Sequence, residues 1–262
     1  MIIDAHCHIF PDNLAERAMA RLSEMYGVHP VGLPTHAGVL AEMDLRGVNR
    51  AVALQVATKP EQVRTINDWA IELAADPRLV PMGALHPAQP PGEIQAEIDR
   101  LVAAGIRGVK LQPFFQQFDP LSPEALDMLR RIGDRLVVII HGGEEMVEVR
   151  PLLTTPERLA TLHDAVPEVR FIMAHLGGYA RWEESLIHLA GRDLYFDISF
   201  TLHCCPRDLA LRILEAHGPE RVVWGSDFPW AAMDWSPISD LDLSPDETAG
   251  ILGENLSRLM NL

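Results

Sequence analysis

Short β-branched apolar runs recur along the 262-residue chain, and amphipathic stretches separate them. Each run is apolar almost throughout rather than alternating with polar residues, which is typical of parallel strands covered on both faces. The runs are IIDAH (2–6), RAVALQV (50–56), LVPMGAL (79–85), IRGVKLQ (106–112), LVVIIH (136–141), VRFIMAH (169–175), LYFDISF (194–200) and RVVWGSD (221–227).

Helix-start signals lie between several of these runs. Thr155 stands before a proline, which is typical of an N-cap followed by the first helical position. Residues 244–247, with the letters SPDE, repeat this arrangement and add a glutamate for a capping box. Thr58 with Glu61 also fits a capping box, and the stretch 92–105 carries apolar residues at helical spacing and stops at a glycine.

Strand and helix therefore alternate eight times, which predicts an α/β fold of the (β/α)8 TIM barrel type, with residues 1–262 as a single domain. The alternative is an open, doubly wound sheet. The lack of a glycine-rich dinucleotide-binding turn after the first run makes that alternative less favourable. The connection at 9–49 is long enough to lie over the mouth of the barrel.

Composition narrows the classes of function. The formal net charge of −15 disfavours nucleic acid as a partner, because an acidic surface repels phosphate. No apolar run reaches the roughly 18 residues of a membrane span. The first residues lack the basic start and apolar segment of a signal peptide, and three cysteines form no disulfide framework. We therefore expect a cytoplasmic protein without a membrane association.

The first run ends in two histidines, within the letters IIDAHCHIF. Residues two apart in a strand point to the same side, so His6 and His8 present two imidazoles to one point. Asp4 is expected on the same face below them. Two imidazoles directed at one point suit a metal ion, which requires further ligands from the rest of the chain.

Other potential ligands stand where later runs end. His141 ends the fifth run, His175 ends the sixth, and Asp227 ends the eighth. In a barrel of this type the chemistry lies at the C-terminal ends of the strands. The sequence therefore predicts that these three side chains converge with His6 and His8 at one rim.

This ordered set resembles the amidohydrolase superfamily. The letters DAHCH in the first run, histidines ending the fifth and sixth, and GSDFPW at the eighth carry the resemblance, which spans nearly the whole chain. The chain is most similar to the amidohydrolase-related branch, which includes aminocarboxymuconate semialdehyde decarboxylase and many metal-dependent hydrolases. The final letters LSPDETAGILGENLSRLMNL resemble the closing helix of that branch. The set is specific for the superfamily and not for a substrate.

The resemblance implies that His6, His8, His141 and Asp227 hold one divalent ion. Imidazoles and a carboxylate suit Zn²⁺ first, with Mn²⁺ and Fe²⁺ also open. Such an ion would activate a bound water, and His175 and Asp227 would be the catalytic acid and base. Lys110 in the fourth run leaves a choice open. It is either a partly buried lysine paired with a carboxylate, or a carboxylated ligand that bridges two ions, with His175 on the second.

Aromatic and basic residues follow the strand ends. Phe114, Phe115 and Phe118 after the fourth run, and Trp230 after the eighth, are expected to form pocket walls, with plain packing between loop and barrel as the alternative. Arg181 is expected to bind a substrate carboxylate, unless it pairs with an acid of the neighbouring letters YARWEE.

The remaining histidines and cysteines are expected to play lesser roles. His86 lines the pocket or lies in a loop, and residues 203–205 (HCC) form pocket wall or packing. His163, His188 and His217 fall on expected helices and are solvated or packed there.

These features predict metal-dependent hydrolysis of a small amide, ester or lactone by an activated water. The alternative is non-oxidative decarboxylation of a small carboxylic acid on the same scaffold. A metal-dependent nuclease is disfavoured by the acidic total, and a non-catalytic binding protein is disfavoured by the intact set of ligands. The expected partner is a small-molecule substrate, and the resemblance implies a homodimer.

Overall fold

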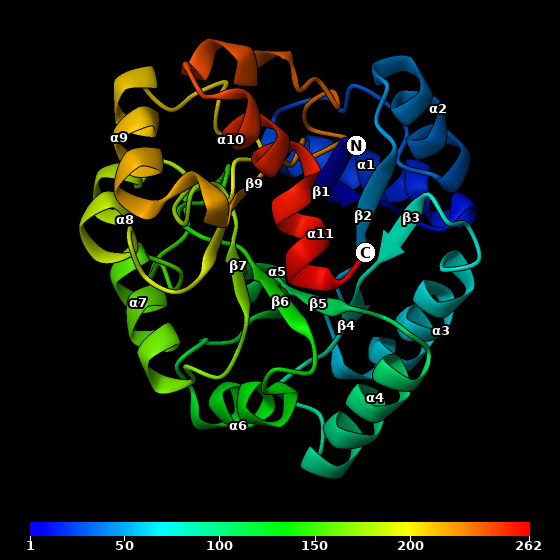
Figure 1. Cartoon of the computed structure of the whole chain (residues 1–262). Helices are drawn as coiled ribbons and strands as arrows, with labels where there is room; N and C mark the ends of the chain where they lie inside the picture. Colours follow the sequence, from blue (N-terminus) through cyan, green and yellow to red (C-terminus); the bar gives the residue numbers. More distant parts are fainter.

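The computed structural model describes residues 1–262 and consists of parallel strands set in a ring with helices outside it (Figure 1). The strands form two sheets, with the orders β1-β2-β3 and β4-β5-β6-β7-β8-β9, and every neighbouring pair is parallel. The strands are β1 (Ile3–His8), β2 (Arg50–Leu54), β3 (Leu79–Pro81), β4 (Gly83–Ala84), β5 (Gly108–Leu111), β6 (Val137–Ile140), β7 (Phe171–Met173), β8 (Tyr195–Asp197) and β9 (Val222–Val223).

The backbone bridges both gaps between the two sheets. Only Met82 separates β3 from β4, and its amide donates to the carbonyl of Ala53 at 2.9 Å. At the other gap, the amide of Ala5 in β1 donates to the carbonyl of Trp224, which follows β9, at 2.8 Å. The (β/α)8 TIM barrel predicted from the eight apolar runs is therefore confirmed.

Helices follow the strands around the outside of the ring, and none of them is both long and apolar enough to cross a membrane. The α-helices are α1 (Asp12–Tyr26), α2 (His36–Arg46), α3 (Val63–Leu73), α4 (Pro91–Ala103), α5 (Pro113–Gln116), α6 (Pro123–Ile132), α7 (Pro156–Ala165), α8 (Trp182–His188), α9 (Arg207–His217), α10 (Pro245–Ala249) and α11 (Asn255–Met260). Shorter helical turns are η1 (Pro60–Gln62), η2 (Pro219–Arg221), η3 (Ser236–Leu241) and η4 (Gly250–Glu254).

The helix starts mostly follow the sequence signals. Thr155 caps α7, since its hydroxyl accepts a backbone N–H of the first turn, and residues 244–247 form a capping box at α10. The capping box predicted for Thr58 and Glu61 is wrong. Gln62 takes that place instead, because its carboxamide oxygen accepts the Thr58 hydroxyl at 3.0 Å and the next backbone amide at 3.1 Å.

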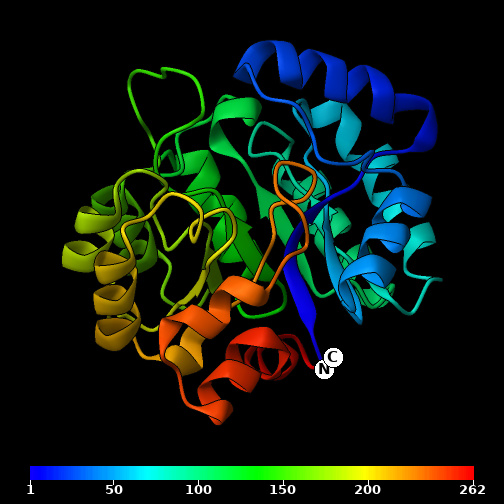
Figure 2. The ribbon, with the colours of Figure 1, turned by 90° about the horizontal axis from the view of Figure 1, so that it is seen from above.

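The long first connection holds α1 and α2 rather than an extended loop. Figure 2 shows α1 at the end of the barrel toward which β1 runs, opposite the end where the two termini meet. The segment after α1 reaches the loop that follows β9, since the amide of Val31 donates to the carbonyl of Pro229 at 2.8 Å. The first connection is thereby fixed at the C-terminal ends of the strands.

Two apolar layers stabilise the barrel. The inner layer lines the ring and includes Val52, Met82 and Ile139, all fully buried. Residues 256–260 of α11 join this layer and close the end of the barrel near the termini (Figure 1). The larger outer layer lies between strands and helices. Each large aliphatic side chain buried in this way contributes about 1.5–3 kcal/mol to folding.

His217 on α9 belongs to the packing of the outer shell, as expected for a helical histidine. Its ring stacks on Phe196 at a centroid distance of 4.1 Å. Nδ1 accepts the amide of Gly191 at 3.2 Å, and Nε2–H donates to the carbonyl of Leu194 at 3.1 Å. Burial, with the nearby Arg221 guanidinium, lowers the pKa of His217 to about 4, so the folded protein holds it neutral.

We expect this histidine to make folding weaker in mild acid. Between pH 6.5 and about 4 the unfolded chain binds a proton at His217 and the folded chain does not, so stability rises with pH across this window. The contribution lost below the window is about 3 kcal/mol. Urea unfolding of the wild type and His217→Gln at several pH values measures it. An unchanged slope of unfolding free energy against pH in the variant would contradict the assignment.

Candidate metal centre

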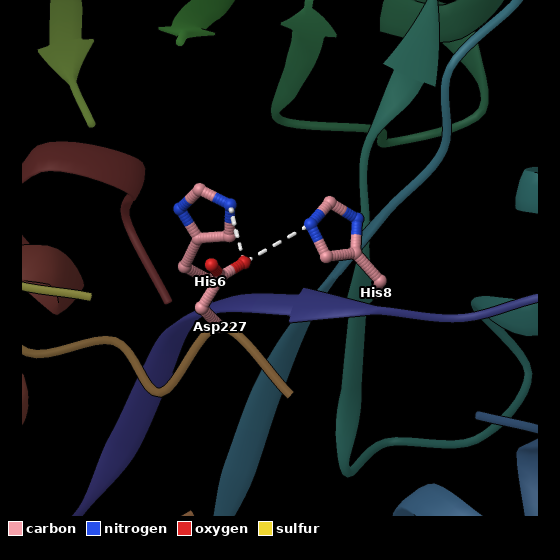
Figure 3. Close-up of side chains that lie close together, drawn as sticks. All are labelled: His6, His8 and Asp227. Atoms are coloured by element: carbon pink, nitrogen blue, oxygen red, sulfur yellow. Dashed lines mark hydrogen bonds and ion pairs between the residues drawn. The ribbon is translucent and has the colours of Figure 1, made fainter. Parts of the chain in front are cut away.

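The end of β1 and the segment after β9 bring three potential ligands together (Figure 3). Asp227 Oδ1 lies 3.1 Å from His8 Nε2 and 3.5 Å from His6 Nε2. One ligand atom from each of these residues lies within 4.8 Å of the others. His6 is buried, whereas His8 and Asp227 are partly exposed toward the mouth. We call this set the His6–His8–Asp227 group.

The backbone around Asp227 explains how it reaches the histidines. Its amide donates to the carbonyl of His6 at 2.8 Å, and its φ of 68° is left-handed, which non-glycine residues seldom adopt. Gly225 lets the two segments approach, because a Cβ there would lie 2.7 Å from His6 Cβ. The letters GSD therefore place a carboxylate directly against β1.

Asp197 at the end of β8 orients the His6 ring. His6 Nδ1 lies 2.8 Å from Asp197 Oδ2, so Nδ1–H donates to this carboxylate and Nε2 is left to face the group. Burial would raise the pKa of Asp197, but the adjacent His6 and His175 imidazoles hold it well below its ordinary value. Asp197 is not among the site residues predicted from the sequence. The sequence feature that could have indicated it is a lone aspartate within the otherwise apolar run LYFDISF.

The chemistry of this group suits a divalent cation. Burial, with the neighbouring Lys110 ammonium, lowers the pKa of His6 to about 4, so its imidazole is neutral and keeps a lone pair. The Asp227 carboxylate stays ionised, because the adjacent His8 and His6 imidazoles outweigh its burial and hold its pKa well below its ordinary value. Two imidazoles and one carboxylate are ligands for Zn²⁺, Mn²⁺ or Fe²⁺.

His141 lies beside the group but is not part of it. Its Nε2 is 3.0 Å from the carbonyl of Glu144 and 3.2 Å from Glu145 Oε1. Its ring centroid is 5.0 Å from that of His175. An Nε2–H that donates to these oxygens cannot present a lone pair to a cation. The role of His141 as a ligand therefore stays a prediction, one that needs a different orientation of the loop after β6.

His175 lies between the other histidines. Its ring centroid is 5.2 Å from that of His6, and its Nδ1–H donates to the carbonyl of Ser199 at 2.9 Å. The amide of His175 also donates to Asp197 Oδ1 at 2.9 Å. All five predicted side chains therefore gather at one rim of the barrel, with His175 oriented by groups from β8.

Lys110 is buried at the base of the site. Its Nζ lies 3.3 Å from His6 Nε2 and makes no ion pair within 4 Å, in contrast to the expected pairing with a carboxylate at the rim. Burial lowers its pKa to about 8, opposed by the carboxylates of Asp197, Asp227 and Glu145. Carboxylation of Lys110 stays a prediction.

Glu145 is a second residue that sequence analysis missed. It is buried, accepts a hydrogen bond from Gln112 Nε2 at 2.8 Å, and lies against His141. Burial raises its pKa to about 7. The sequence feature that could have indicated a role for Glu145 is its position four residues after His141, in the letters HGGEE.

Arg181, which was predicted to bind a substrate carboxylate, forms ion pairs with two glutamates of this chain. Arg181 donates to Glu144 Oε1 at 2.6 Å and to Glu184 Oε1 at 2.8 Å, and Arg150 donates to Glu144 as well. The pairing with an acid of YARWEE, left open by the sequence, is therefore present at Glu184. Binding of a substrate carboxylate by Arg181 stays a prediction, and these ion pairs compete with it.

The predicted aromatic walls do meet. Phe114 packs on Phe115 at 5.2 Å between ring centroids, and Phe115 and Trp230 both contact Tyr26 of α1. His86 is held in its loop, since its Nε2–H donates to the carbonyl of Gln116 at 3.0 Å. Within the segment 203–205, His203 packs against Phe200 of the same loop.

The profile of the amidohydrolase family matches residues 3–262. No curated protein matches, but many solved structures share the fold. The 5-carboxyvanillate decarboxylase of Novosphingobium aromaticivorans, complexed with manganese and 4-hydroxy-3-methoxy-5-nitrobenzoic acid, is 15% identical, with 100% of this chain and 96% of that chain covered and a TM-score of 0.77.

Two further structures show the range of activities on this fold. A dihydroxybenzoic acid decarboxylase of a Polaromonas species, with bound manganese and 2-nitroresorcinol, is 14% identical, with 100% and 97% coverage and a TM-score of 0.75. A putative 2-pyrone-4,6-dicarboxylic acid hydrolase of Pseudomonas putida is 19% identical, with 99% and 97% coverage and a TM-score of 0.71. The profile match over nearly the whole length makes the chain a member of the amidohydrolase family, and hence an enzyme of that superfamily.

Proposed function

We propose that this enzyme catalyses the metal-dependent decarboxylation of a small aromatic carboxylic acid. The observation that carries the proposal is the combination, at one end of the barrel, of the His6–His8–Asp227 group and the buried Lys110 ammonium with the aromatic side chains of Phe115 and Trp230. Cations bind a carboxylate, and an aromatic wall binds a ring. The decarboxylases of aromatic acids among the matched structures support the same reaction.

The His6–His8–Asp227 group would hold one divalent ion, with His141 as a fourth ligand if its Nε2 turns away from Glu144. A divalent ion supplies positive charge that binds substrate oxygens and stabilises negative charge during the reaction. Two matched decarboxylases contain manganese, and this set of ligands suits Mn²⁺ as well as Zn²⁺. Because Lys110 Nζ lies 3.3 Å from His6 Nε2, the lysine has to move away from that nitrogen when an ion binds there.

His175 is placed to deliver the proton that decarboxylation requires. When the bond between the ring carbon and the carboxylate breaks, CO₂ leaves and the ring carbon takes up one proton. Since His175 Nδ1–H donates to the carbonyl of Ser199, Nε2 is the atom that exchanges a proton with the substrate. Asp227, partly exposed beside His8, is the second proton-transfer group that we propose.

Hydrolysis, the first expectation from the sequence, is the second candidate. The match to a putative 2-pyrone-4,6-dicarboxylic acid hydrolase supports it, because that protein has the same fold. The two reactions use the same ligands and differ in their products. Decarboxylation releases CO₂ and creates a new C–H bond, whereas hydrolysis introduces an oxygen from water.

The first test is turnover of aromatic acids by the Mn²⁺-loaded protein. We expect 5-carboxyvanillate or 2,6-dihydroxybenzoate to release CO₂, and in D₂O the product to carry one deuterium at the vacated ring carbon, as measured by NMR. His175→Ala should lower kcat by at least about 100-fold, because general acid catalysis contributes that much, and should leave metal content unchanged.

His188→Ala on α8 is the matched control, since this histidine lies on the outer helices and should leave kcat unchanged. Incorporation of ¹⁸O from water into the product of a lactone or amide substrate, without CO₂ release from any acid, would contradict decarboxylation and favour hydrolysis.

A second prediction concerns Asp197. Asp197→Asn keeps the size of the side chain but removes the charge that fixes the His6 tautomer, so we expect the affinity for Mn²⁺ or Zn²⁺ to fall by about 10- to 100-fold. Calorimetric titration of the metal-free protein measures this change. Asp193→Asn, an exposed residue at the start of the same strand segment, is the control. Equal affinities of the two variants would show that Asp197 does not support the metal site.

A further inference from the structure

Tyr26, the last residue of α1, contacts two of the predicted pocket walls. Its ring packs edge-on against Trp230, with centroids 5.4 Å apart and an interplanar angle of 83°. Phe115 lies on another side at 6.2 Å and 69°. The three rings come from the first connection, from α5 and from the loop after β9, and we call them the Tyr26–Phe115–Trp230 cluster. No pattern in the sequence marked Tyr26 as a functional residue.

The cluster lies next to the His6–His8–Asp227 group. The amide of Trp230 donates to the carbonyl of Asp227 at 2.8 Å, so one turn of chain joins the two sets. Figure 2 shows α1 at the same end of the barrel. A molecule held by the His6–His8–Asp227 group therefore has an aromatic surface beside it, formed by residues that are not ligands.

Local structure fixes the position of Tyr26. Gly27 ends α1 with a left-handed φ of 69°, and its amide donates to the carbonyl of Ser23. Beyond it, the amide of Val31 donates to the carbonyl of Pro229, two residues after Asp227. The cap at Gly27 and the hydrogen bond between Val31 and Pro229 therefore fix the position of Tyr26 relative to the segment that carries Asp227.

The Tyr26 hydroxyl makes no hydrogen bond with any other group of the chain. Burial, with the carboxylates of Glu145 and Asp227 nearby, raises its pKa well above the ordinary value, so it remains a neutral donor. The hydroxyl is not among the buried polar atoms that lack a partner, so solvent reaches it, and a ligand oxygen can replace solvent as the acceptor of its hydrogen bond.

Other donors for a carboxylate at the mouth are already engaged. Glu144 accepts from both Arg181 and Arg150, and Arg207 donates to the carbonyl of Asp240. Lys110 is buried at the base of the site. Within the aromatic wall, two donors therefore lack a hydrogen-bond partner in the chain, the Tyr26 hydroxyl and the indole N–H of Trp230.

We propose that Tyr26 is a substrate-binding residue: its ring packs on the aromatic ring of the substrate, and its hydroxyl donates a hydrogen bond to a substrate carboxylate oxygen. The class of ligand rests on the proposed function. Because negative charge leaves the carboxylate as CO₂ forms, this hydrogen bond is stronger in the bound substrate than in the transition state, so its loss should raise KM without lowering kcat.

The experiment measures binding of benzoate and of cyclohexanecarboxylate to the Mn²⁺-loaded protein by calorimetry. The two probes share a carboxylate and nearly the same size, and only benzoate has an aromatic face. Tyr26→Phe should weaken both probes by about tenfold and keep the preference for benzoate, because it loses only the hydrogen bond. Tyr26→Leu should weaken both and also reduce the preference for benzoate.

Tyr195→Phe is the matched control, since this tyrosine packs against the inner apolar layer, starts β8 and lies away from the cluster. Trp230→Leu is a second variant that should reduce the preference for benzoate while the Tyr26 hydroxyl remains. Circular dichroism of each variant verifies folding.

Three results would overturn the proposal: wild-type protein that binds neither probe, Tyr26→Phe with wild-type affinity for both, or Tyr26→Leu with an unchanged preference. Because binding requires no turnover, these results are separate from a failure of the proposed reaction. A protein that decarboxylates an acid while Tyr26→Phe binds both probes normally would disprove the role of Tyr26 alone. Binding as expected without CO₂ release would disprove the reaction alone.

Discussion

The hydrogen bond between His6 Nδ1 and Asp197 Oδ2, 2.8 Å long, is the contact on which the candidate site depends. It joins β1 to β8 inside the barrel, where both side chains are buried. The same carboxylate accepts the amide of His175, and Ser199 two residues later accepts from the His175 ring. One strand end therefore sets the orientation of two imidazoles, and leaves Nε2 of each available for chemistry.

This arrangement concentrates charge in an interior that is otherwise apolar. Asp4 lies below the histidines and accepts hydrogen bonds from the Ser226 hydroxyl and amide and from the His6 amide, while burial raises its pKa to about 7. These contacts hold the end of β1 against the segment that carries Asp227. Buried polar networks of this kind are costly unless every member is paired, so their presence at the strand ends marks a site kept for function rather than stability.

The barrel supplies the ligands, and the connections supply the surroundings. The aromatic wall beside the His6–His8–Asp227 group comes from the first connection, from α5 and from the loop after β9. Glu144 forms ion pairs with both Arg181 and Arg150. Connections can change without disturbing the ring, which is why one fold can support several reactions. We therefore propose that residues such as Tyr26 influence the choice of substrate more than the ligands do.

The sequence by itself determined the eight strands, the caps at Thr155 and Ser244, and the positions of five ligand-type side chains at strand ends. These features follow from local periodicity and from the rule that parallel strands end at one rim. Only the tertiary structure decided that Asp197 orients His6, 191 residues away, that His141 turns toward Glu144, and that Tyr26 packs against Trp230. Such contacts depend on which side chains meet across the ring, and no local pattern encodes that distance.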